Sequence, residues 1–266
     1  MKSLRVAIWG LGRHAINNIL PAVSAADGLA LYGVCSRDAR TVSSYSEKCK
    51  CKGWTDPALM LRDPEVEVVY VATPIGLHAE HGKQVLDAGR HLWCEKPLTR
   101  ELPATLGLLD AARKRRLSIC EGFMYLYHPQ FARLCKYVTD GALGKIRSVA
   151  CRFGIPALEH PGFRSNPLLG GGALFDVGSY PVSALNSLFP EEKLQILYAA
   201  IDHRNGAAVD TDGRALLALS SGAVASLEWR TSCAYRNERC GRERCISSRC
   251  RRNSVLEGWG ERLKGC

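Results

Sequence analysis

Residues 4–15, LRVAIWGLGRHA, decide the fold of the first half of the chain. The apolar run 4–9 leads into a turn with glycine at positions 10 and 12, and this pattern predicts a strand, a tight turn and a helix. Gly10 permits the turn, Gly12 lets the backbone approach a pyrophosphate, and the small Ala15 lets the helix pack closely against the strand.

A turn of this kind is either a structural glycine turn or a dinucleotide site, and the short pattern alone fits both. In a dinucleotide site the diphosphate lies on the helix amino terminus. The candidate cofactor-binding residues of the turn are Gly10, Leu11, Gly12, Arg13 and His14.

Alternating strand and helix patterns continue as far as residue 121. Strands are predicted over 30–35, 66–72 and 91–94, with helices over about 78–88 and 101–115. This alternation predicts an α/β fold with a parallel, doubly wound Rossmann sheet. We therefore expect a dinucleotide-binding domain over residues 1–121.

The end of the second strand indicates which dinucleotide binds, because the adenosine ribose lies there. Ser36 and Arg37 offer a hydroxyl and a guanidinium, which suit a 2′-phosphate, so NADP is favoured over NAD. Two alternatives stay open: Arg37 is a solvated loop residue, or Asp38 binds a free ribose after a shift of the turn.

Further polar residues follow the later strands, at the sheet edge where ligands of such folds bind. Thr73 and Pro74 end the third strand, and His78 is either a cofactor neighbour or a residue of the helix start. Glu95 and Lys96 follow the next strand, and Pro97 fixes the direction of the chain there, so we expect Lys96 to point into the crevice.

The second region, residues 122–238, is predicted to be an α+β domain with an open, mostly antiparallel sheet. Its expected strands are 146–153, 194–200, 212–219 and 223–229. Glycines 170–172 fit either a backbone approach to a ligand or a flexible linker.

Asp176 and Tyr180 of the second region each have a structural interpretation from the sequence alone. Asp176 precedes an apolar stretch and fits a helix cap, while Tyr180 fits a core aromatic residue.

Five motifs together resemble the Gfo/Idh/MocA oxidoreductases over residues 4 to about 238. They are Gly10 to Arg13, Thr73-Pro74 with His78, 88–91 leading to Glu95-Lys96-Pro97, 121–125 with His128-Pro129, and 170–180. Ala15 replaces the third glycine of the turn, a change that the pattern tolerates.

The resemblance implies that Lys96, Asp176 and Tyr180 carry catalysis, with Tyr180 transferring the proton. A tyrosine at this position is similar to the glucose-fructose oxidoreductase, dihydrodiol dehydrogenase and xylose dehydrogenase branch, which implies a sugar or cyclic diol substrate. A reductase of a cyclic imine or ketone is the alternative enzyme. The resemblance also implies a homo-oligomer that forms through the second sheet.

The expected chemistry is hydride transfer between nicotinamide and a CH–OH group, with proton transfer through a side chain. The phenol of an isolated tyrosine has a pKa of about 10. A nearby ammonium favours phenolate, so we expect Lys96 to lower the pKa of Tyr180.

The sequence changes character after Glu238. Residues 239–266 hold eight basic and three acidic residues, a net charge of +5 within a whole-chain charge of +10, together with four cysteines. We expect a truncated second domain over 122–238, followed by a basic Cys/Arg-rich tail produced by a shifted reading frame or a premature end. Sequencing the encoding DNA tests this: an intact frame, with the same tail in related genes, contradicts it.

Two other interpretations of the tail are less favoured. The five-residue spacing of Cys240, Cys245 and Cys250 lacks the close pair that is typical of zinc sites, so no metal is expected. The arginines lack interleaved aromatic residues, so no nucleic-acid partner is expected.

The composition, with 46% hydrophobic residues, fits a globular protein. The longest apolar runs are too short for a membrane span, and we expect a cytoplasmic protein with reduced thiols. One non-catalytic alternative remains, in which the chain binds NADP but lacks the strands needed for turnover.

Overall fold

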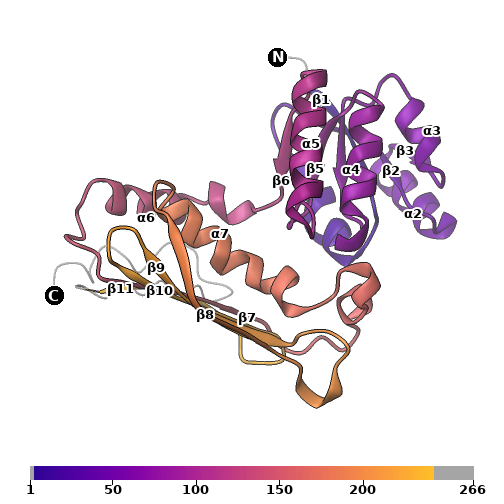
Figure 1. Cartoon of the computed structure of the whole chain (residues 1–266). Helices are drawn as coiled ribbons and strands as arrows, with labels where there is room; N and C mark the ends of the chain where they lie inside the picture. The colour runs from indigo at the N-terminus through magenta and orange to yellow at the C-terminus, as the bar shows by residue number, and fades with distance from the viewer. Residues whose placement is uncertain (1–2, 243–266) are drawn as a thin grey trace.

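The computed structural model describes residues 3–242, which form two units joined after β6 (Figure 1). The first unit is a six-stranded sheet in which every pair of neighbours is parallel, as predicted. In sheet order the strands are β3 (Lys52–Trp54), β2 (Leu29–Cys35), β1 (Leu4–Trp9), β4 (Val68–Val71), β5 (His91–Cys94) and β6 (Ile119–Glu121).

Helices cover both faces of this sheet because its strands carry apolar side chains on both sides. Val6 and Ile8 of β1 pack in one apolar cluster, and Ala7 and Trp9 pack in another on the opposite face. The helical segments are η1 (Ala15–Ile19), α1 (Leu20–Ala25), α2 (Ala39–Cys49), α3 (Pro57–Arg62), η2 (Ile75–Leu77), α4 (His78–Asp87) and α5 (Leu102–Arg115).

Gly10 makes the turn after β1 possible. Its φ is +107°, a backbone conformation that favours glycine, and a Cβ at this position would lie 2.7 Å from the carbonyl oxygen of Ala72. The glycine therefore allows the loop after β1 to approach the end of the neighbouring strand β4.

The second unit is a five-stranded sheet with one parallel pair, β7 with β10, and three antiparallel pairs, so it is mostly antiparallel as predicted. In sheet order the strands are β11 (Arg236–Arg242), β7 (Ser148–Gly154), β10 (Val224–Arg230), β9 (Asp212–Leu219) and β8 (Leu194–Asp202). The helical segments are η3 (Met124–Tyr127), α6 (Pro129–Thr139), η4 (Gly162–Ser165), η5 (Pro167–Leu169), η6 (Leu174–Gly178), α7 (Ser179–Leu188) and η7 (Arg204–Gly206).

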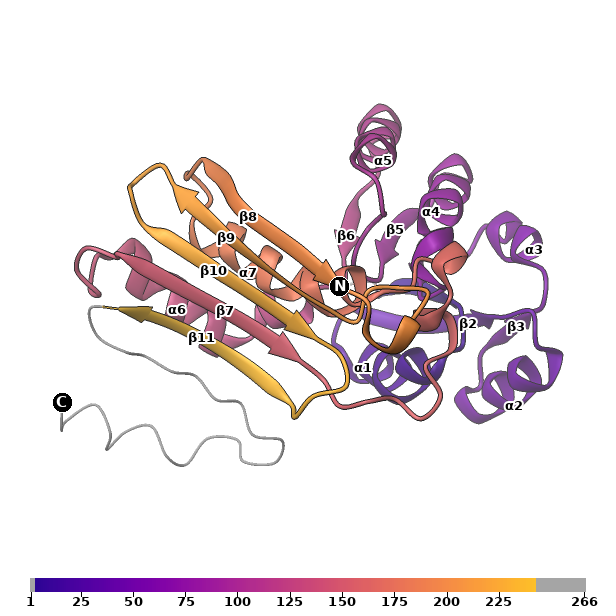
Figure 2. The ribbon, with the colours of Figure 1, turned by 60° about the horizontal axis from the view of Figure 1, so that its bottom comes forward.

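α6 and α7 lie against one face of this sheet, and Figure 2 shows the strands from the opposite side. Alternation along β10 explains the difference between the faces: Leu227 and Trp229 are buried, whereas Glu228 and Arg230 are exposed. Trp229 fills the space beside Gly178 and Gly213, where a Cβ would lie within 3 Å of the indole.

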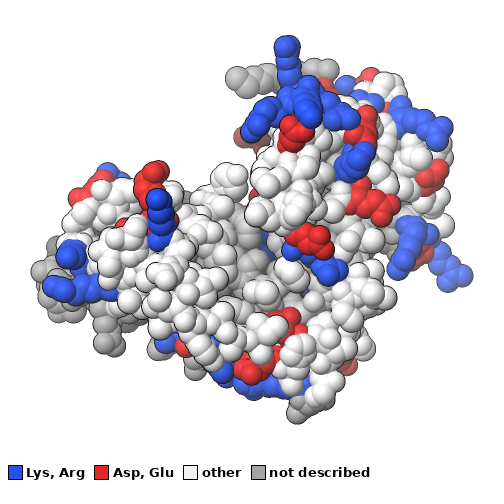
Figure 3. Space-filling view, viewed as in Figure 1, with Lys and Arg blue, Asp and Glu red and all other residues white. Residues whose placement is uncertain are grey.

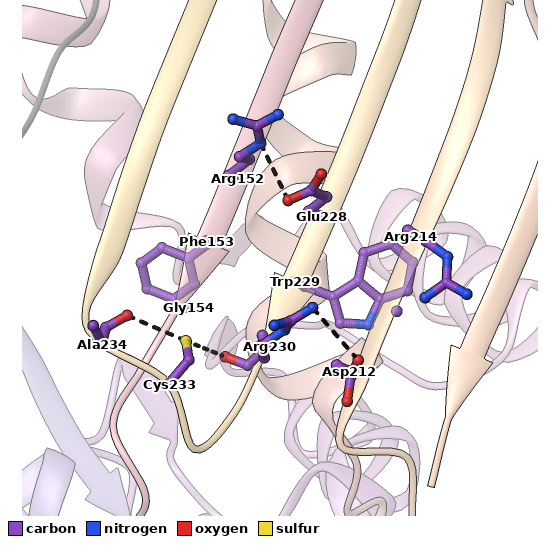
Figure 4. A pocket seen from close by; sticks show the side chains of 11 residues that line it. Arg152, Phe153, Gly154, Asp212, Arg214, Glu228, Trp229, Arg230, Cys233 and Ala234 are labelled. Atoms are coloured by element: carbon purple, nitrogen blue, oxygen red, sulfur yellow. Dashed lines mark hydrogen bonds and ion pairs between the residues drawn. The ribbon is translucent and has the colours of Figure 1, made fainter. Parts of the chain in front are cut away.

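The open face also has a hollow of about 220 Å³ with charged walls (Figure 4). Arg152 lies 3.2 Å from Glu228, and Arg230 lies 3.9 Å from the buried Asp212. These opposite charges compensate one another within the sheet.

The sheet continues past the predicted tail boundary at Glu238. β11 pairs with β7 from Arg236, opposite Gly154, to Arg242, opposite Ser148. Residues 239–242 are therefore part of a strand, although the sequence there has little strand periodicity. Cys245 and Cys250 lie outside the described residues.

Exposed apolar side chains lie along β8, among them Ile196 at 66% and Tyr198 at 51% exposure. They form an exposed apolar surface on the edge strand of the open sheet, which is compatible with contact between subunits. The homo-oligomer stays a prediction. Within residues 3–242, no helix combines the length and the hydropathy that a membrane crossing requires.

The Gly10 turn yields a stability prediction. Gly10→Ala should reduce the free energy of unfolding by about 2 kcal/mol or more, because the methyl group meets the Ala72 carbonyl in addition to the usual cost of a positive φ. Gly28→Ala is the matched control, since Gly28 has a φ of +81° but open space around it, and should cost only about 1 kcal/mol. Urea unfolding measures both, and equal losses would contradict the close-approach explanation.

Candidate active site

The ends of β1, β4 and β5 are tied together at one sheet edge by the side chain of Glu95. The Tyr70 hydroxyl of β4 donates a hydrogen bond to Glu95 Oε1, and His14 Nε2, in the turn after β1, lies 3.1 Å from the same oxygen. Burial opposes the ionisation of Glu95, but the hydrogen bonds from His14 and Tyr70 outweigh it and lower its pKa. Glu95 thus links the glycine turn to the segment that carries Lys96.

His78 lies beneath this edge and is only 1% exposed. Its Nδ1 is 2.9 Å from the Pro97 carbonyl oxygen, and its Nε2 is 2.9 Å from the Thr73 carbonyl oxygen. Burial is the main effect on its pKa, which is lowered. The neutral ring donates to one of these two carbonyl oxygens and lies against the other. These contacts favour the structural alternative for His78, which lies between the chain ends after β4 and β5.

Lys96 and Asp176 join the two units. The Lys96 ammonium donates to the backbone carbonyl of Asp176, and its Nζ lies 3.3 Å from Asp176 Oδ1. Arg164 Nε donates to the other carboxylate oxygen, Oδ2, at 2.6 Å. Asp176 is 7% exposed, and although burial opposes its ionisation, Lys96 and Arg164 lower its pKa.

The position of Lys96 is set by the chain around it. Pro97 follows, and the next backbone amide, that of Leu98, donates to Glu121 Oε1 at the end of β6 over 2.7 Å. The segment after β5 is thereby fixed to the neighbouring strand, and Lys96 faces the second unit.

Asp210, rather than Asp176, caps the start of η6. Asp210 Oδ2 accepts from the Leu174 amide at 2.7 Å, and its backbone oxygen accepts from the Ala173 amide at 2.9 Å. Gly172 has a φ of +118°, and a Cβ there would lie 2.1 Å from Asp210 Oδ1. This close packing leaves the Asp176 side chain free to bind Lys96 and Arg164.

Tyr180 follows one turn after Asp176 and lies beside Lys96. The centroid of its ring is 4.8 Å from Lys96 Nζ and 4.7 Å from the centroid of the Phe153 ring, and its hydroxyl points to Met124 Sδ at 3.8 Å. A hollow of about 200 Å³ opens next to it, and its lining includes Tyr125, Tyr235 and Asn237. Figure 3 shows the surface hollowed between the two units.

The predicted pKa shift of Tyr180 is wrong in direction. Burial raises the pKa of the phenol, and the negative charges of Glu95 and Asp176 raise it further. Lys96 contacts the ring rather than the hydroxyl, and its charge is shared with Asp176. Tyr180 is therefore a neutral phenol near neutral pH.

The end of β2 carries the residues predicted to select the dinucleotide. Asp38 accepts from the Arg40 amide at 3.0 Å and from the Thr41 hydroxyl at 2.7 Å, which makes it the amino-terminal cap of α2. Arg37 is exposed and Ser36 is half-buried beside it. The Arg37 and Asp38 side chains are both exposed, but the Asp38 carboxylate already accepts two hydrogen bonds from the start of α2.

The remaining predicted residues line the same edge of the sheet. Gly12 and Arg13 are exposed, Leu11 is half-buried, and nothing lies within 4 Å of the position of a Cβ on Gly12. The Thr73 hydroxyl lies 2.9 Å from His81 Nδ1, and Pro74 leads into η2. Backbone at Gly12 is open to a ligand, as a diphosphate site requires.

Sequence reasoning missed three residues of this arrangement: Tyr70, Arg164 and Asp210. Tyr70 is concealed in an apolar strand, and Asp210 is 34 residues from Asp176 in the sequence. The position of Arg164 shortly before the glycines was the one available signal. Within residues 3–242, no group of three or more His, Cys, Asp or Glu residues is placed to hold a metal ion.

The chain belongs to the GFO/IDH/MocA oxidoreductase family. The family model described as an oxidoreductase family with an NAD-binding Rossmann fold matches residues 4–123, and the model of the GFO/IDH/MocA C-terminal domain matches residues 131–247. The second match continues past Glu238, in agreement with the extent of β11.

Among individual relatives, a dTDP-3,4-didehydro-2,6-dideoxy-α-D-glucose 3-reductase of Actinomadura kijaniata is 35% identical over 237 residues, which cover 88% of this chain and 70% of that protein. The crystal structure of KijD10, a 3-ketoreductase from Actinomadura kijaniata in complex with NADP and TDP-benzene, has a TM-score of 0.84 at 35% identity, covering 91% of this chain and 74% of that one. A D-xylose 1-dehydrogenase (NADP⁺) of Haloferax volcanii is 30% identical, with 83% and 67% coverage.

The environment of Tyr180 yields a titration prediction. Absorbance at 295 nm reports the ionisation of tyrosine. Between pH 8 and 11 the titration curves of the folded wild type and of folded Tyr180→Phe should have the same steps, because the raised pKa keeps the Tyr180 phenol protonated. The same comparison in urea should show the missing step near pH 10, where an unfolded tyrosine titrates. A wild-type-specific step at or below pH 10 in the folded protein would contradict the prediction.

Proposed function

We propose that the protein is an NADP-dependent oxidoreductase that transfers a hydride between nicotinamide and a sugar or cyclic diol. The observation that carries the proposal is the meeting of Lys96, Asp176 and Tyr180 at the sheet edge that also holds the glycine turn. The names of the relatives, a dTDP-sugar 3-reductase, a 3-ketoreductase and a D-xylose dehydrogenase, support the substrate class.

The open backbone at Gly12 and the tight turn at Gly10 fit a bound dinucleotide, which would supply or accept the hydride. Tyr180 acts on the substrate oxygen as the acid or base. With its phenol neutral, Tyr180 supplies the proton in the reductive direction, in which a carbonyl oxygen gains negative charge and takes the phenolic proton.

Lys96 stabilises the negative charge that develops on that oxygen, since its ammonium lies beside the Tyr180 ring. Asp176 holds Lys96 in place through the carboxylate and the backbone carbonyl. In the oxidative direction the same ammonium favours the deprotonated form of the substrate hydroxyl.

NADP rather than NAD fits the end of β2. A 2′-phosphate needs a cation and hydrogen-bond donors, which the exposed Arg37 and the hydroxyl of Ser36 provide. A free ribose needs a carboxylate acceptor, but that of Asp38 already caps α2. KijD10, which binds NADP in its crystal structure, supports the same choice.

The relatives give a second candidate within the enzyme class, a reductase of a ketone in a pyranose ring, as in the dTDP-sugar 3-reductase. The non-catalytic alternative is a chain that binds NADP without turnover. The experiment below separates the three.

Purified protein is titrated with NADPH by fluorescence and then assayed at 340 nm, with keto-sugar nucleotides and NADPH in one arm and with aldoses or cyclic diols and NADP in the other. Lys96→Met and Tyr180→Phe should each lower kcat/KM about 100-fold or more, while the Kd for NADPH changes little. Tyr137→Phe is the matched control and should retain activity, because Tyr137 lies in α6 and its hydroxyl accepts a hydrogen bond from Arg133 Nε of the same helix. Binding without turnover by the wild type would refute the enzyme, and unchanged turnover in Tyr180→Phe would refute the mechanism.

The cofactor choice has its own test. Arg37→Asp should weaken NADPH binding about 10- to 100-fold, because it removes a charge-assisted hydrogen bond and adds a repulsive charge, and should affect NADH far less. Arg62→Asp, an exposed arginine at the end of α3, controls for the change in net charge. Equal effects of Arg37→Asp on both dinucleotides, measured by fluorescence titration, would remove the 2′-phosphate assignment.

A further inference from the structure

Arg164 contacts Asp176, but the proposed mechanism gives it no role. It belongs to η4, in the loop between β7 and η6, and its Nε donates to Asp176 Oδ2. The side chain is 36% exposed, and the guanidinium carbon lies 4.8 Å from the centroid of the Phe163 ring. Its backbone carbonyl accepts from the Gly172 amide at 3.0 Å, so the loop is tied to the segment that begins η6.

The two oxygens of the Asp176 carboxylate are divided between two cations. Oδ1 faces Lys96, from the first unit, and Oδ2 accepts from Arg164, within the second unit. A carboxylate that is 7% exposed and has only one cation beside it either turns both oxygens to that cation or takes up a proton. Both changes would alter how Lys96 is held.

We propose that Arg164 is a positioning residue of the site: it keeps the Asp176 carboxylate ionised and oriented so that one oxygen alone faces the Lys96 ammonium. Lys96 then remains beside Tyr180, where its ammonium stabilises the negative charge that develops on the substrate oxygen. This inference rests on the proposed function and assigns to it a residue that acts through Asp176 and not on the substrate.

The groups that face Asp176 within the described residues limit what else can titrate there. Lys96 comes from the segment after β5, Arg164 from η4, and Tyr180 lies one turn along at the start of α7. Glu95 acts on Tyr180, and Asp210 bonds to the backbone at the start of η6. Among residues 3–242, loss of Arg164 therefore leaves Lys96 as the one cation beside the carboxylate.

The test compares Arg164→Gln, Arg164→Lys and the wild type in the full chain. For Arg164→Gln we expect the acidic limb of the pH profile of kcat/KM to move to higher pH, kcat to fall about 10- to 100-fold, and the KM of the sugar to change less than about twofold. Arg164→Lys restores the charge without the same geometry, so it should return the acidic limb towards the wild-type position and recover part of kcat.

Arg204→Gln is the matched control. Arg204 Nε lies 2.7 Å from Asp212, another buried aspartate of the second unit, and Asp212 has no part in the Lys96 contact. This variant should leave the pH profile unchanged. An unshifted limb in Arg164→Gln, a loss confined to KM, or a loss equal to that of Arg204→Gln would overturn the proposal.

A second readout does not depend on turnover. The pKa of Asp176, measured from the ¹³C shift of its carboxyl group and assigned with Asp176→Asn, should be higher in Arg164→Gln than in the wild type. An unchanged Asp176 pKa overturns the positioning role even if the enzyme is active. A wild type that lacks turnover refutes the proposed function, while the carboxyl titration still decides the role of Arg164.

Discussion

The ion pair between Lys96 and Asp176 is the constraint on which the site depends. An ionised carboxylate that is 7% exposed is costly unless cations and hydrogen bonds surround it, and removing one partner of such a buried pair typically costs about 3–5 kcal/mol. Lys96 belongs to the first unit and Asp176 to the second. Neutralisation of this carboxylate by Lys96 therefore stabilises the packing of the second unit against the carboxyl edge of the parallel sheet.

Polar contacts organise the sheet edge, and apolar contacts organise the layers beneath it. Glu95 joins the strand ends of β1, β4 and β5 through His14 and Tyr70, and His78 lies between two backbone carbonyls below them. Val69, Val71 and Leu92 underneath are almost completely buried. These contacts preorganise the sheet edge. The protein therefore loses less conformational entropy when a cofactor binds there.

Much of the strand order was predictable from the sequence, since periodicity reports which faces are buried, but β3, β6 and β11 were not predicted because they are short or polar. The strands over 4–9, 91–94 and 212–219 have the predicted bounds, because turn-forming or charged residues flank them. The resemblance to the family, rather than spacing, singled out Lys96, Asp176 and Tyr180. The Arg164 contact and the capping by Asp210 were not predictable, because they depend on how one loop folds back. The pKa direction of Tyr180 also failed, since the sequence gives the ammonium but not the ring contact or the neighbouring carboxylates.

The pairing of β11 with β7 has a consequence for the order in which the protein is made. β7 is synthesised about 80 residues before its edge partner, and Tyr235 and Asn237, which line the hollow beside Tyr180, arrive with that partner. A nascent chain that has reached Trp229 already contains Lys96, Arg164, Asp176 and Tyr180, yet one wall of the hollow is absent. The hollow beside Tyr180 therefore lacks one wall until β11 has been made and docks on β7.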